Sequence, residues 1–181
     1  MIKRPVPANF KSRLPVGSAA LDTPDRVIEY CRKHGLMNGY GAVDIQSLIE
    51  KNDNLKLVFE DLGEKDAYIK CLDDGSFVIG INKLHHKNRQ VFSMAHEYGH
   101  YQLHRHNIKN IAIGEKILHR DGEINAIERQ ANQFAANILM PREGVERALF
   151  ETHNSVIGAA SLLGVSMAAL TNRLNTLGIK A

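Results

Sequence analysis

The residues with the clearest chemical potential are His96, Glu97 and His100, which form an H-E-x-x-H sequence. Because an α-helix turns by about 100° per residue, histidines four residues apart lie about 40° apart on one helix face. Both imidazoles can therefore bind one metal ion, and the acidic residue between them can reach water beside that ion without being a ligand. The spacing predicts one zinc ion held by His96 and His100, with Glu97 as general base.

A catalytic zinc ion takes three protein ligands and leaves one position open. His106 lies ten residues after His96, but the pattern that uses such a histidine has a glycine where this chain has Leu103. Glu128 is favoured, because it falls within the apolar stripe of a later predicted helix, where an unpaired carboxylate would be costly. The alternative is that Glu128 is a boundary residue paired with an arginine or lysine, and Glu123 is a weaker candidate ligand.

Several other side chains could support this site. Asn132 lies one turn after Glu128 and could hydrogen-bond a ligand histidine. A second donor usually stabilises the oxyanion formed in peptide hydrolysis. The candidates, among which the sequence does not choose, are Tyr98, Tyr101, His104 and His119. Of these, Tyr98 and His104 could instead be core residues or supports of the ligands.

The elements that must position these residues predict an α+β fold, in which a small antiparallel or mixed sheet packs on a helical zinc core. Asp73, Asp74 and Gly75 are typical of a hairpin turn between two strands. The predicted strands are residues 55–59, 67–72 and 76–81, and the helices that carry the site are residues 89–102 and 123–139. Strand 76–81 could bind an extended peptide along its edge, or be an ordinary packed strand.

Three regions are expected along the chain. Residues 1–20 carry three prolines and form an extended arm, residues 21–150 form a metallopeptidase domain, and residues 151–181 form a helical pair packed on it. The pair has the spacing of a helix-turn-helix, with Gly164 at the turn. However, its second helix has only Arg173 as a cation, whereas phosphate contacts normally need several. A structural pair is therefore favoured over a DNA-binding one.

Two blocks of sequence resemble the ImmA/IrrE family of zinc metallopeptidases. The first block is the H-E-x-x-H segment from Arg89 to His104, and the second runs from Glu128 to Pro141. The C-terminal residues from Gly164 to Gly178 are also similar, so that the resemblance covers about residues 40–180.

The resemblance implies that His96, His100 and Glu128 are the zinc ligands and that Glu97 is the general base. One departure is Gln130, which stands where the family usually has a glutamate. The resemblance also implies a metalloendopeptidase that cleaves a helix-turn-helix transcriptional repressor or antitoxin partner and so causes derepression. The alternative is a non-proteolytic, zinc-containing regulatory or DNA-binding protein of a toxin–antitoxin pair.

Composition excludes several other classes of protein. The 181 residues are 44% apolar and 24% charged, as in globular domains, and no apolar run approaches the roughly 18 residues of a membrane span. A net charge of +3 is too small to indicate nucleic-acid binding by itself. Cys31 and Cys71 are too few for a disulfide scaffold, and the N-terminal residues, which lack an apolar segment, are not expected to act as a secretory signal. A cytoplasmic location with free thiols is therefore expected.

Overall fold

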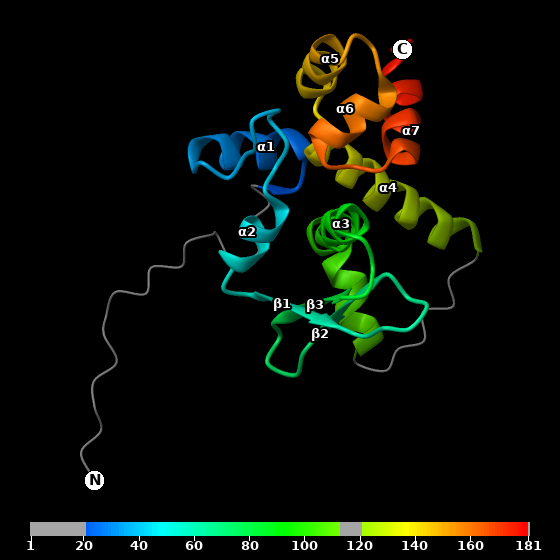
Figure 1. Cartoon of the computed structure of the whole chain (residues 1–181). Helices are drawn as coiled ribbons and strands as arrows, with labels where there is room; N and C mark the ends of the chain where they lie inside the picture. Colours follow the sequence, from blue (N-terminus) through cyan, green and yellow to red (C-terminus); the bar gives the residue numbers. More distant parts are fainter. Residues whose placement is uncertain (1–20, 113–120, 181) are drawn as a thin grey trace.

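The computed structural model describes the backbone of residues 21–112 and 121–180, and the side chains of residues 21–108 and 126–180 (Figure 1). The arm predicted over residues 1–20 lies outside the described residues. The described residues form seven helices and three strands, which is an α+β fold as predicted. The elements are α1 (Pro24–Lys33), α2 (Ile45–Glu50), β1 (Leu55–Glu60), β2 (Ala67–Cys71), β3 (Phe77–Asn82), α3 (Lys87–Ala112), α4 (Asp121–Leu139), α5 (Arg142–Glu151), α6 (Val156–Leu163) and α7 (Met167–Leu177).

The sheet is mixed, with the strand order β1-β3-β2. The predicted hairpin is confirmed: β2 and β3 are antiparallel, and Gly75 in the turn between them has φ +81°, a conformation that favours glycine. Strand β1 pairs with β3 in parallel. Because β3 has a neighbour on both sides and all six of its residues are buried, the expectation that strand 76–81 offers an edge to a peptide is wrong. Within the part of the chain that the structure describes, the edge strand on the hairpin side is β2.

Helix α3 lies between the sheet and α4 and contacts both (Figure 1). It continues well past the predicted end near residue 102. Gly99 faces α4 at close range, since a Cβ atom on it would lie 3.3 Å from the Cα atom of Ala131. The missing side chain therefore allows α3, which carries His96 and His100, and α4, which carries Glu128, to approach closely.

The C-terminal helices pack on the end of this core. Helices α6 and α7 are separated by Gly164, whose φ of +68° gives the left-handed C-cap that ends α6. The side chain of Arg173 on α7 donates a hydrogen bond to the carbonyl of Met140, and Asn88 on α3 donates one to the carbonyl of Val165. These bonds fasten α7 and the α6–α7 turn to the helices around the site.

No single helix among the described residues is long and apolar enough to cross a membrane. Helices α6 and α7 reach that length and apolarity only when taken together, and they are bent by 104° relative to each other.

Candidate metal centre

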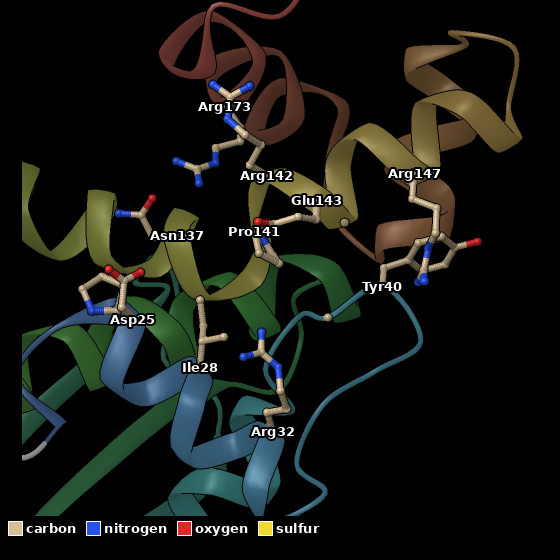
Figure 2. A pocket seen from close by; sticks show the side chains of 13 residues that line it. Asp25, Ile28, Arg32, Tyr40, Asn137, Pro141, Arg142, Glu143, Arg147 and Arg173 are labelled. Carbon is tan, nitrogen blue, oxygen red and sulfur yellow. The ribbon is translucent and has the colours of Figure 1, made fainter.

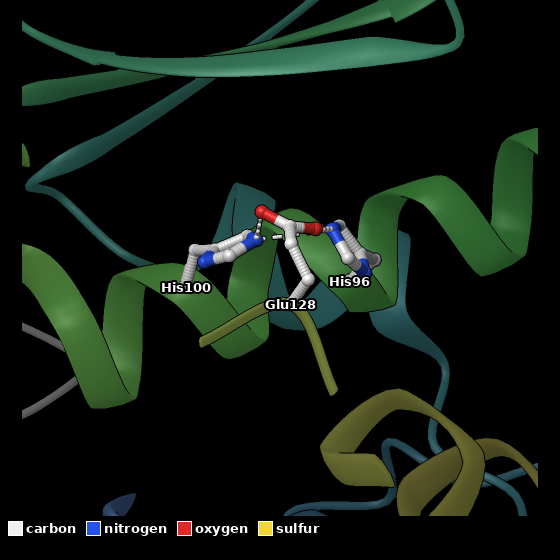
Figure 3. Close-up of side chains that lie close together, drawn as sticks. All are labelled: His96, His100 and Glu128. Carbon is white, nitrogen blue, oxygen red and sulfur yellow. Dashed lines mark hydrogen bonds and ion pairs between the residues drawn. The ribbon is translucent and has the colours of Figure 1, made fainter. Parts of the chain in front are cut away.

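Three predicted ligands converge from two helices (Figure 3). His96 and His100 come from α3, and Glu128 from α4, so that the three side chains meet between the helices. The Nε2 atoms of the two histidines lie 3.0 Å apart. The Glu128 carboxylate spans them, with one oxygen 3.2 Å from Nε2 of His96 and the other 3.3 Å from Nε2 of His100.

These spacings fit a tetrahedral zinc site. Zinc binds nitrogen and oxygen donors at about 2.0–2.2 Å, so tetrahedral geometry places the donor atoms about 3.3 Å from one another. The separations of 3.0–3.3 Å are close to that value, with each imidazole facing a different oxygen of the carboxylate. Two imidazoles and one carboxylate are also a donor set that leaves a fourth position free for chemistry.

Glu128 was favoured as a ligand because it was expected to lie in the apolar stripe of its helix, and the structure shows that this expectation is wrong. Its side chain is 48% exposed and does not face the core. Among the side chains of α4 that the structure describes, the buried ones begin one turn later, at Ala131, and continue through Phe134 and Ala135. Glu128 lies on the last turn before that stripe, where α4 borders an open cleft, so its carboxylate reaches the histidines from the solvent side.

Neighbouring groups hold the histidines in a form suited to binding a metal. Oδ1 of Asn132 lies 2.9 Å from Nδ1 of His96, the contact expected of a group that orients a ligand. Burial and the adjacent His96 lower the pKa of His100, which favours the neutral imidazole that binds metals.

Glu97 is buried beside the three converging groups, with 8% of its surface exposed. Burial, with a smaller contribution from the charge of Glu128, raises the pKa of Glu97 to about 7. A carboxylate with such a pKa exchanges protons efficiently near neutral pH.

The site opens into a cleft of about 410 Å³ between α3 and strand β2. Sequence reasoning missed the β2 side of this cleft, because local patterns do not reveal which strand lies at the sheet edge. The lining residues are Tyr68, Ile69, Lys70, Cys71, His96, Glu97, His100, Ile108 and Glu128.

The remaining candidates are separated by the structure. Tyr98 and Tyr101 are almost fully buried in the core, where Tyr98 accepts a hydrogen bond from Gln102, so neither phenol is placed to stabilise an oxyanion. The ring of His104 lies 5.6 Å from that of His100, and Nε2 of His104 has no hydrogen-bond partner among the described residues. That nitrogen is buried and His104 does not line the cleft at the site, so none of the described candidates is placed to stabilise an oxyanion.

Of the three other candidates, the structure describes the side chain of one. His106 is exposed on α3 and is not part of the His96–His100–Glu128 group. His119 and the side chain of Glu123 lie outside the described residues.

Comparison with known proteins agrees with this site. The family model for the IrrE N-terminal-like domain, Peptidase M78, matches residues 51–175, a span that contains all three converging side chains. The chain belongs to this family. The predicted resemblance to ImmA/IrrE metallopeptidases is thereby confirmed, and Peptidase M78 membership makes a metal-dependent peptidase the expected class of protein.

One relative of this chain is the metallopeptidase ImmA of Bacillus subtilis (strain 168). The two sequences are 32% identical over 129 residues. The match covers 68% of this chain and 66% of ImmA. Among solved structures, a transcriptional regulator of Mycobacterium tuberculosis superposes with a TM-score of 0.61 at 17% identity. That match covers 84% of this chain and 46% of the regulator, and it supports the fold alone.

Proposed function

We propose that this Peptidase M78 protein is a zinc-dependent metalloendopeptidase, a hydrolase of peptide bonds. The observation that carries the proposal is the convergence of His96, His100 and Glu128 beside the buried Glu97. This arrangement provides three ligands, an open position and a base in one cleft, which peptide hydrolysis by a metal site requires.

The residues of the chain divide the catalytic work. When bound, zinc supplies a Lewis acid that polarises the scissile carbonyl and makes water more acidic. Glu97 takes the proton from the attacking water and later gives it to the leaving amine. Burial raises the pKa of Glu97 in the metal-free chain, which favours the protonated form that gives the proton to the leaving amine.

Strand β2 is the element that we expect to position the substrate. It is an edge strand of the sheet, and Tyr68, Ile69, Lys70 and Cys71 line the same cleft as Glu97. An extended peptide that added to this edge by main-chain hydrogen bonds would run past the ligands. The substrate would then be an unfolded or loop segment of a protein rather than an intact helix.

For the substrate itself we propose a helix-turn-helix repressor or antitoxin, whose cleavage would relieve repression in the cytoplasm. Support comes from the family and from the lack of an accessible positive charge on α7. Arg173, the only cation of α7, is 7% exposed, so its charge does not reach the outer face of the helix where the phosphates of a DNA duplex would lie. The chain is therefore better suited to act on a regulatory protein than on DNA.

The test replaces the base and leaves the ligands in place. Glu97→Gln should keep its zinc, measured by elemental analysis, and lose cleavage of the helix-turn-helix protein encoded beside this chain by about 10²- to 10⁴-fold. Glu29→Gln, on the exposed face of α1, is the matched control and should cleave normally. Fragments are quantified by mass spectrometry. Cleavage by Glu97→Gln at the wild-type rate would contradict the enzymatic assignment and favour a non-proteolytic regulator.

A further inference from the structure

A second cavity, of about 850 Å³, shares no lining residue with the cleft at the metal centre. It lies where α1, the end of α4, the start of α5 and α7 meet (Figure 2). Its lining carries four arginines against two carboxylates, those of Asp25 and Glu143, so the cavity has an excess of positive charge. The arginines are Arg32, Arg142, Arg147 and Arg173.

Arg173 is the unusual member of this group because it is 7% exposed. Its Nε donates to the carbonyl of Met140 at 2.9 Å, and its two terminal nitrogens have no hydrogen-bond partner among the described residues. A buried cation is costly unless an anion compensates it. Here the adjacent charged group is another cation, Arg142, whose charge together with burial lowers the pKa of Arg173.

Arg142 is held so that it faces the same space. Its Nη1 pairs with Glu146 at 3.0 Å, and its Nη2 donates to the carbonyl of Leu177 at 2.8 Å. Figure 2 shows the Arg142 and Arg173 guanidinium groups next to each other at one wall of the cavity. Two fixed guanidinium groups of like charge repel each other, and an anion between them removes that repulsion.

The backbone adds to this wall. Helix α5 begins at the cavity, and its N-cap residue, Pro141, supplies no side chain to cap the first turn. At Gly144 in that turn, a Cβ atom would lie 2.0 Å from the carbonyl oxygen of Tyr40, so a side chain is excluded there. The start of a helix carries free N–H groups and partial positive charge, both of which favour an anion.

The other charged side chains of the cavity do not occupy the wall formed by Arg142, Arg173 and the start of α5. Arg147 is occupied on the far side of the cavity, where it pairs with Glu151 at 3.8 Å and lies over the ring of Tyr40 at 4.7 Å. Asp25 and Glu143 are both exposed and can turn toward solvent.

We propose that this cavity binds a phosphate group between Arg173, Arg142 and the start of α5. Guanidinium groups bind phosphate through pairs of parallel hydrogen bonds, and donors from three directions suit a tetrahedral oxyanion better than a planar carboxylate. The cavity exceeds the size of a phosphate ion, and Ile28 and Pro141 supply an apolar wall, so a small phosphate monoester also fits. The proposal does not depend on the peptidase activity.

Inorganic phosphate is the first probe, titrated into the zinc-loaded full chain by calorimetry and by thermal unfolding at constant ionic strength. Wild type should bind phosphate and unfold at a higher temperature than in sodium chloride. Arg142→Gln and Arg173→Gln should each weaken binding by about tenfold or more, because each removes a charge-assisted donor. Arg142 is half-exposed, so its variant provides the test if Arg173→Gln does not fold.

Arg26→Gln is the matched control, because Arg26 forms an i,i+4 ion pair with Asp22 as Arg142 does with Glu146, but does not line the cavity. It should bind phosphate like wild type. A second titration with adenosine monophosphate separates the sources: tighter binding than phosphate identifies a monoester, and equal binding identifies the free ion. The proposal is overturned if wild type does not bind phosphate, or if Arg142→Gln binds phosphate with the wild-type affinity.

Discussion

His96 is contacted through both of its ring nitrogens. Nε2 faces His100 and Glu128, and Nδ1 lies 2.9 Å from Oδ1 of Asn132. The amide oxygen can accept a hydrogen bond from Nδ1–H, which fixes the proton on Nδ1 and leaves Nε2 as the nitrogen that binds the metal. Asn132 therefore acts on the metal through the orientation and tautomer of His96.

Replacement of this amide should weaken the metal site without removing a ligand. We expect Asn132→Ala to lower zinc affinity by about 10- to 100-fold, the usual cost of losing a group that orients a ligand histidine. Competition with a chromophoric chelator measures the change. Gln133→Ala, at the neighbouring exposed position, should bind zinc like wild type. Equal zinc affinity in both variants would mean that Asn132 does not orient His96.

For individual residues, the sequence predicted the contacts that depend only on the spacing of residues along a helix. His96 and His100 meet because the helical repeat requires it, and Asn132 contacts a ligand because it lies one turn beyond Glu128. The exposure of Glu128 was not predictable, because the apolar pattern of α4 does not show where a neighbouring element stops covering it. The burial of Tyr101 was missed for the same reason, whereas a core position had been the alternative for Tyr98, since phenols occur in cores and in active sites alike.

Among the elements, the contact between α3 and α4 determines whether the ligands meet. Gly99 lies one residue before His100, and its absent side chain lets the backbone of Ala131 approach. Ala131 follows Glu128 by three residues, so the closeness of the helices sets the distance from the carboxylate to both imidazoles.

A side chain at position 99 should separate these helices. In Gly99→Val, the branched side chain would press against the backbone of Ala131 and Cβ of Phe134. Neither of these can move aside easily. We expect it to destabilise the fold by about 1–3 kcal/mol in urea unfolding, and to lower zinc affinity as well. Gly39→Val is the control, because no atom lies within 4 Å of a Cβ atom there. Full zinc affinity in Gly99→Val would contradict this role of the helix contact.

The hairpin of β2 and β3 followed from local turn residues, but the order of the sheet did not. Asp73, Asp74 and Gly75 join neighbouring strands, whereas the parallel pairing of β1 with β3 depends on contacts between distant segments. The position of β2 at the free edge, and hence the wall of the catalytic cleft, is a consequence of that pairing.

Across the whole molecule, one core connects the N-terminal helices to the site. Cys31 of α1 is fully buried in this core, whereas Cys71 of β2 is half-buried in the cleft beside the metal centre. Burial, with a smaller contribution from the charge of Asp44, raises the pKa of Cys31 to about 12. The folded chain therefore keeps Cys31 as a neutral thiol at pH 8.

The two thiols should react at very different rates. With a disulfide reagent at pH 8, Cys71 should react in the native state, and Cys31 should react only on unfolding, because unfolding returns its pKa to about 8.5. Peptide mapping by mass spectrometry assigns each modified cysteine. Cys71→Ser should remove the fast phase and leave the slow one. Modification of Cys31 in native buffer as fast as in urea would show that α1 is not held in the core.

The most direct test of the metal centre is a crystal structure of the zinc-loaded chain with anomalous data collected at the zinc edge. We predict one zinc peak, bonded to Nε2 of His96, Nε2 of His100 and a carboxylate oxygen of Glu128, each at about 2.0–2.2 Å. A peak bound elsewhere, or a zinc coordinated by the two histidines while Glu128 points away, would contradict the account.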